Sequence, residues 1–163
     1  QVVYDESFQA FSPLEEQTVL VLVPYASEAA SVKFAINRMR QEGSLGEFYT
    51  EYVVYQDSEL SDEEIKEKIK TADYMILGSE EDLGLDSDAA KEAAEAAMSF
   101  GKEAVTAVLC TGLPYQTELY PDLPCIVCYG ETGMSEEDAK SGVITGRYGP
   151  NIPAAVETIF GVD

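Results

Sequence analysis

The stretch from Glu103 to Gly130, EAVTAVLCTGLPYQTELYPDLPCIVCYG, decides the fold. Its two ends, Ala104 to Cys110 and Cys125 to Tyr129, are short segments with apolar residues at consecutive positions. Such runs are typical of strands that helices cover on both faces. Glycine and proline residues between them exclude a long helix and leave room for a short one around Tyr115 to Leu119. The stretch therefore predicts two parallel strands joined by a compact crossover.

Alternating strand and helix signals fill most of the remaining sequence. Further strands are predicted at Thr18 to Val23, Tyr49 to Tyr55 and Ala72 to Leu77. Helix starts are predicted where a serine can cap the first turn, at Ser27, Ser61 and Ser87. A closing helix is predicted to begin near Asn151 and to end at Gly161.

This alternation predicts an α/β fold. We expect a three-layer sandwich, with an open, mostly parallel sheet of about five strands and helices on both faces, in a flavodoxin-like or related strand order. Residues 18–163 are expected to form a single α/β domain. Because the sequence begins at Gln1 rather than Met, we expect residues 1–17 to be a linker from a missing upstream domain. Ligands of such sheets bind at the carboxyl ends of the strands, where a site is to be sought.

The charge balance limits the possible partners. The sequence has 31 acidic and 10 basic residues, and its formal net charge is −21. This charge opposes binding to the phosphates of nucleic acids and to anionic membrane surfaces. No apolar run approaches the ~20 residues that a membrane-spanning helix needs. We therefore expect neither nucleic acid nor a membrane as a partner.

The three cysteines, Cys110, Cys125 and Cys128, all fall in predicted buried strands, where cysteine behaves as a small hydrophobic residue. Cys125 and Cys128 have the spacing of a redox motif or of half a zinc site. In a strand, however, residues three apart point to opposite faces and lie ~10 Å apart. Because the sequence also has no histidine, we expect neither a zinc site nor a redox role.

The loops after the predicted strands lack the nucleotide-binding signatures. Pro24 to Ser27, after the first strong strand, matches neither the dinucleotide-binding nor the phosphate-loop pattern, and it lacks the dense serine, threonine and glycine run of a flavodoxin. A receiver domain would have an aspartate at the end of the third strand, where this sequence has Gly78. We therefore expect no cofactor.

Carboxylates cluster in one loop, from Gly78 to Asp88 (GSEEDLGLDSD). Glycosidic bonds are cleaved by paired carboxylates, one acting as the acid and the other as the base or nucleophile. Glu80 and Glu81 are the catalytic candidates in this cluster. The favoured interpretation, however, is that these side chains are solvated loop charges and helix caps in an already acidic chain. The spacing of Asp82, Asp86 and Asp88 does not match an EF-hand calcium loop.

Three segments carry a resemblance to a known family. The run from Gly112 to Gly130, with its Pro114-Tyr115 connector, resembles the C-terminal α/β domain of glycoside hydrolase family 3. Ala72 to Gly78 is similar to the third-strand entry of that domain, and Pro153 to Gly161 to its closing helix ending in Phe-Gly. The likeness follows the order of elements from about residue 18 to 161 and is specific mainly after Ala72. The Pro-Tyr connector favours the β-N-acetylglucosaminidase branch over the β-glucosidases.

The resemblance implies that the catalytic machinery lies elsewhere. In that family the nucleophilic aspartate lies on an N-terminal (β/α)8 barrel of roughly 250 residues, which this sequence lacks. In the acetylglucosaminidase branch the acid/base is a histidine paired with an aspartate, also on the barrel. Many β-glucosidases instead take an acid/base glutamate from a loop near the position of Glu80 and Glu81. Residues 131–150 depart from the family pattern.

These observations lead to two functional hypotheses. The first is a non-catalytic C-terminal accessory domain of a family 3 glycosidase, whose partners are the barrel of its own parent chain and, together with that barrel, a carbohydrate. Asp82 and Tyr115 are then expected to contact the substrate or the barrel, although a tyrosine in such a connector can also pack against its own domain. The second is a free-standing flavodoxin-like binding or interaction domain.

Overall fold

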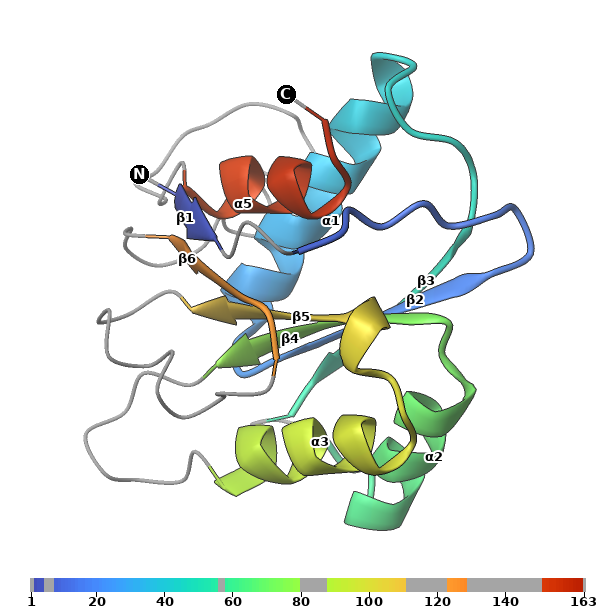
Figure 1. Ribbon diagram of the computed structural model, residues 1–163, viewed down its shortest axis with the longest axis vertical. Coiled ribbons are helices and arrows are strands. Elements are labelled where there is room, and N and C mark those ends of the chain that lie inside the picture. Colours follow the sequence, from blue (N-terminus) through green and yellow to red (C-terminus); the bar gives the residue numbers. More distant parts are fainter. Residues whose placement is uncertain are drawn as a thin grey trace.

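The computed structural model describes residues 2–4, 8–55, 58–79, 88–110, 123–128 and 151–162. They form a six-stranded sheet with helices on both sides (Figure 1). The strands are β1 (Val2–Tyr4), β2 (Thr18–Val23), β3 (Tyr49–Val54), β4 (Tyr74–Ser79), β5 (Thr106–Cys110) and β6 (Cys125–Cys128). The helices are α1 (Ala26–Gln41), α2 (Asp62–Thr71), α3 (Asp88–Ser99) and α5 (Asn151–Ile159), and a 3-10 turn, η1 (Glu103–Val105), precedes β5.

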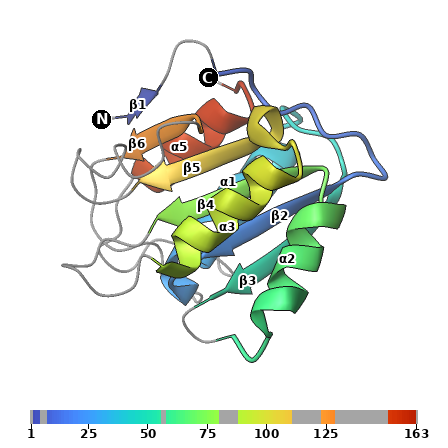
Figure 2. The ribbon, with the colours of Figure 1, turned by 60° about the horizontal axis from the view of Figure 1, so that its bottom comes forward.

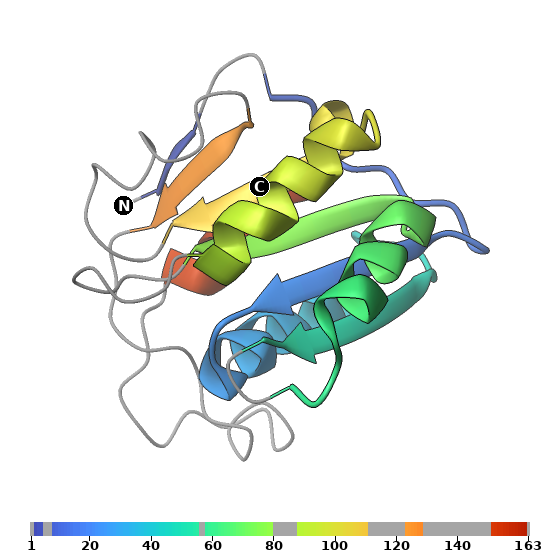
Figure 3. The same ribbon diagram turned by 90° about the horizontal axis from the view of Figure 1, so that it is seen from below.

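The strand order is β1-β6-β5-β4-β2-β3, and the five strands from β2 to β6 are parallel. Numbered along the chain, these five follow the order 2-1-3-4-5 of flavodoxin-like sheets. The predicted α/β sandwich is thereby confirmed, including the parallel pairing of β5 with β6. Figure 2 and Figure 3 show α2 and α3 covering one face, with α1 and α5 behind the sheet. None of the helices in the described ranges combines the length and apolar character that crossing a membrane requires.

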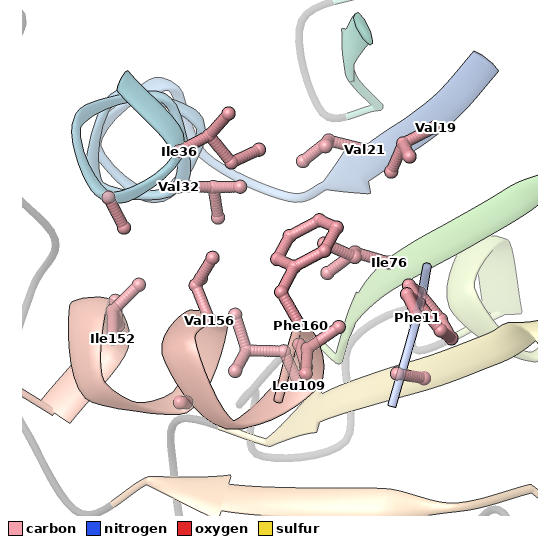
Figure 4. Close-up of a cluster of buried hydrophobic side chains, with 14 of the residues drawn as sticks. Phe11, Val19, Val21, Val32, Ile36, Ile76, Leu109, Ile152, Val156 and Phe160 are labelled. Atoms are coloured by element: carbon pink, nitrogen blue, oxygen red, sulfur yellow. The ribbon is translucent and has the colours of Figure 1, made fainter. Parts of the chain in front are cut away.

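The face under α1 and α5 has a core of bulky side chains (Figure 4). Val32 and Val156, from the two helices, point toward one another and are fully buried. Both helices bury an apolar stripe: Val32, Ile36 and Met39 on α1, and Ile152, Val156, Ile159 and Phe160 along α5.

The opposite core depends on small side chains. Five alanines of α3 are buried, Ala90, Ala93, Ala94, Ala96 and Ala97. They pack against strand residues such as Leu22, Leu77 and Val108. Because alanine adds little bulk beyond the helix backbone, α3 can approach the sheet closely.

Residues 2–17, which we expected to belong to a linker, contribute to the fold where the structure describes them. β1 pairs antiparallel with β6, so that Val3 lies opposite Val127. Phe11 is 2% exposed, and its ring lies 4.7 Å from that of Tyr74. The Phe11 N–H donates to the Ile159 carbonyl at 2.8 Å. The packed domain therefore begins before residue 18, because this segment fills the space between β4 and the end of α5.

The helix starts match the expectations in one of the two described cases. The Ser61 hydroxyl accepts a hydrogen bond from the Glu64 N–H at 3.2 Å and caps α2 as predicted. The prediction for Ser27 is wrong, because α1 begins at Ala26 and its cap residue is Tyr25, which makes no side-chain cap. Ser27 already lies within the first turn, and its carbonyl accepts the Ser31 hydroxyl at 3.0 Å. Ser87 lies outside the described residues.

Candidate functional site at the carboxyl edge

The strand order marks one point on the carboxyl edge of the sheet. The chain leaves β2 through α1 to reach β3 on one side, and it later crosses to β4 on the other side. At such a reversal the connections leave in opposite directions, and sheets of this order bind ligands there. The candidate site therefore lies between the carboxyl ends of β2 and β4.

A short corner joins β2 to α1 at this point. Val23 is fully buried, whereas Tyr25 is 47% exposed and is one of the few large hydrophobic side chains in the described ranges that are exposed. The Tyr25 carbonyl accepts the N–H groups of Glu28 and Ala29, at 3.1 and 3.2 Å. The corner thus turns directly into the helix and leaves the Tyr25 ring at the surface.

Glu28 places a carboxyl group at the start of α1. It is only 4% exposed, in the first turn of the helix. The partial positive charge at a helix N-terminus favours an acidic residue in this position.

Gly78 allows the ends of β2 and β4 to pack closely. A Cβ atom at this position would lie 2.9 Å from Val23 Cγ1 and 3.0 Å from Pro24 Cδ, closer than such atoms approach. The Gly78 carbonyl also accepts the Tyr55 hydroxyl at 2.9 Å. Tyr55 follows β3, so its side chain reaches past β2 to β4. The base of the site is therefore tightly closed, and the ends of three strands are fixed together.

A small cavity lies beside Tyr55, between α2 and α3. It is partly open to solvent, has a volume of about 30 Å³ and is lined by Leu22, Tyr55, Asp62, Ile65, Lys66, Ile69, Ala89, Glu92 and Ala93. This volume corresponds to about one water molecule, whose share of the liquid is ~30 Å³. Ligand pockets measure ~300–1,000 Å³. The cavity itself is therefore too small for a sugar.

The four predicted site residues, Glu80, Glu81, Asp82 and Tyr115, lie outside the described residues. The structure does place the strand ends that precede them. Ser79, the last residue of β4, is the register partner of Cys110, the last residue of β5. The loops that carry the predicted residues thus start from adjacent positions on the carboxyl edge, next to the corner between β2 and α1.

The structure confirms the strand that contains two of the cysteines. Cys125 and Cys128 begin and end β6, and Cys125 is half-buried, with Sγ 3.5 Å from the Leu123 carbonyl. Within the described ranges, no three His, Cys, Asp or Glu side chains gather closely enough to hold a metal ion. The absence of a zinc or redox role at Cys125 and Cys128 stays a prediction.

Two features of the site were not predicted from the sequence. Glu28 lies four residues before Val32, in phase with the buried stripe of α1, and extending that stripe backwards would have identified it as buried. The contact between Tyr55 and Gly78 has no sequence signal, because it joins residues from two strands that are separated by β2.

Neither a scan against protein-family models nor a search of curated proteins gave a match for this chain.

Proposed function

We propose that the chain is a non-catalytic accessory domain of a family 3 glycoside hydrolase of the β-N-acetylglucosaminidase type. In this role it acts beside a (β/α)8 barrel that carries the nucleophile and the acid/base. The reaction of the whole enzyme is the hydrolysis of terminal β-linked sugars. The domain contributes surface at the carboxyl edge of its sheet, where the loops with Glu80, Glu81, Asp82 and Tyr115 begin.

The observation that carries this proposal is where the family-like segments fall in the fold. Ala72–Gly78 supplies most of β4, Cys125–Cys128 forms β6, and Pro153–Gly161 covers most of α5 and its end. Ile76, Ile126 and Val156, one from each segment, belong to the same buried core. The likeness therefore follows a connected part of the domain.

The end of α5 supports the same proposal. Phe160 is 6% exposed and stacks on Phe48, with ring centroids 5.7 Å apart. Gly161 adopts a φ of 70°, which glycine tolerates far better than other residues, and a Cβ there would lie 2.9 Å from that of Ala10. The Phe-Gly pair is thus required by the packing, as expected for a characteristic feature of the closing helix.

The corner between β2 and α1 also offers a surface that suits a carbohydrate. An exposed tyrosine such as Tyr25 offers the flat apolar face and the hydroxyl that suit a sugar ring.

A free-standing flavodoxin-like binding or interaction domain is the second candidate. It is favoured by the completeness of the fold, because five parallel strands in a known order bury both faces under the chain's own helices. The coding sequence upstream of Gln1 distinguishes the two. A barrel with a glycosidase motif containing lysine and histidine supports the first candidate.

The kinetic test compares the 163-residue chain with a longer protein that includes the upstream barrel. We expect only the longer protein to hydrolyse an aryl N-acetyl-β-glucosaminide. In that protein, Glu81→Gln and Tyr115→Ala should alter kcat or KM several-fold, whereas Glu95→Gln, on the exposed side of α3, should leave both unchanged. Turnover by the short chain alone, lost in Glu80→Gln or Glu81→Gln, would show that the domain is itself catalytic. Unchanged constants in both site variants would exclude these loops from the substrate and barrel contacts.

A further inference from the structure

The outer edge of β3 is open in the described part of the chain. β3 is the last strand of the sheet and pairs with β2 alone. The N–H groups of Tyr49 and Tyr55 donate to Gln17 and Val23, on the β2 side. Because backbone groups alternate along a strand, those of Thr50, Tyr52 and Val54 point away from the sheet. Three donors and three acceptors therefore line this edge.

The usual protections of an exposed edge are weak in β3. Natural edges are blunted by proline, bulges, short length or charged side chains. β3 has six residues, YTEYVV, without a proline, and its register with β2 is unbroken. Its one charged side chain, Glu51, forms an ion pair with Lys68 of α2. Among the residues that the structure describes, none therefore blocks this edge against another strand.

The sequence of β3 is compatible with a second copy of itself. In an antiparallel pair centred on Tyr52, the outward groups of Tyr52 meet those of its copy, and Thr50 pairs with Val54 of the other chain. On the opposite face Glu51 then lies across from Val53 rather than from a second glutamate. A register centred on Glu51 would instead place two like charges opposite each other, which is destabilising.

Tyr52 brings no charge to the centre of this arrangement. Burial raises the pKa of its phenol above the ordinary value of 10.0, and this effect outweighs the opposing effects of its hydrogen bond with Thr50 and the charge of Arg40. The side chain is therefore neutral at physiological pH.

We propose that β3 is a self-association edge through which two copies of this chain pair antiparallel about a two-fold axis at Tyr52. The two sheets then form one continuous sheet. One strand pair buries less than the ~1,600 Å² of a standard interface, so the dimer is weak. Each chain carries a formal net charge of −21, so added salt strengthens the association by screening repulsion.

The decisive variant is Thr50→Pro, measured by sedimentation equilibrium on the 163-residue chain over a range of protein and salt concentrations. Proline removes an outward N–H and keeps the bonds to β2, which use the N–H groups of the odd-numbered residues. We expect it to weaken the dimer by about 100-fold or more, since two intermolecular hydrogen bonds are lost and the ring meets the other strand. Thr50→Ala, which retains the N–H, should dimerise like the unmodified chain.

Two outcomes would overturn the proposal. One is an unmodified chain that stays monomeric at every concentration and salt level, and the other is a Thr50→Pro variant that dimerises as tightly as Thr50→Ala.

If Thr50→Pro does not fold, oxidation of cysteine variants replaces it. Tyr52→Cys should form a disulfide between chains, because paired Cα atoms at this position lie ~5.5 Å apart. Tyr49→Cys is the control, since Tyr49 is 65% exposed but lies far from its own copy in this register. Equal cross-linking of the two variants, or none in Tyr52→Cys, rejects the pairing.

Discussion

The two cores of this domain bury surface in different ways. Under α1 and α5, large side chains fill the space above the sheet, among them Phe11, Ile36, Val156 and Phe160. Under α2 and α3, alanines such as Ala93 and Ala97 allow the helix to lie close to the strands. One face of the sheet is thus covered by large side chains, and the other by a helix that lies close to the strands. The stability of the domain should therefore fall most when a large side chain of the first core is truncated or when an alanine of the second core is enlarged.

The largest loss of stability is expected when a large side chain of the core under α1 and α5 is truncated. Phe11→Ala should lower the free energy of unfolding by ~3–5 kcal/mol, because it leaves a cavity between Tyr74 and Phe160. Urea denaturation followed by circular dichroism measures this change. Leu14→Ala, at a side chain that is 61% exposed, is the control and should stay within ~0.5 kcal/mol. Equal effects of the two variants would mean that Phe11 does not belong to the core.

A smaller loss is expected from enlarging the alanine core. Ala97 is fully buried, so Ala97→Leu should force α3 away from the sheet and cost ~1–3 kcal/mol. Ala89→Leu makes the same change at an exposed position of α3 and should stay within ~0.5 kcal/mol. Thermal unfolding of both variants measures the difference. If Ala97→Leu is as stable as Ala89→Leu, α3 is not close-packed against the sheet.

The smallest loss of stability is expected at the helix starts, where a serine that caps α2 is compared with a serine in the first turn of α1. Ser61→Ala should cost ~1 kcal/mol, because it removes the cap of α2. Ser27→Ala should cost less, since Ser27 makes no cap and only its carbonyl, which alanine retains, accepts the Ser31 hydroxyl. Urea midpoints of the two single variants test this ranking. A loss in Ser27→Ala that matches the loss in Ser61→Ala would show that Ser27 does cap α1.

Local patterns were sufficient to predict most of the fold. Consecutive apolar residues identified β2, β4, β5 and β6, because strands covered on both faces need apolar side chains on both. The start of β5 was predicted too early. The Thr106 hydroxyl donates to the Lys102 carbonyl at 2.8 Å, and the residues between them form the turn η1 rather than strand. A bond of this kind competes with strand pairing and does not alter the apolar pattern.

Features that depend on distant partners were not predicted. Phe11 lies in a mostly polar segment, and distant parts of the chain supply neighbours that its local sequence does not reveal, such as Tyr74 and Phe160. For the candidate site, the sequence predicted loops after β4 and β5, whose last residues are adjacent in the sheet, but neither the burial of Glu28 nor the bond between Tyr55 and Gly78. Its four site residues remain predictions, since they lie outside the described part of the chain.

The bond between Phe11 and Ile159 has a consequence for the time course of folding. It joins the beginning of the domain to its last helix, and β1 likewise pairs with β6. During synthesis, residues near Phe11 leave the ribosome long before their partners exist. Contacts with such sequence separation form slowly, because a long loop must close before they add stability. The ring of Phe11 can therefore complete its packing, against Phe160, only after α5 has been made.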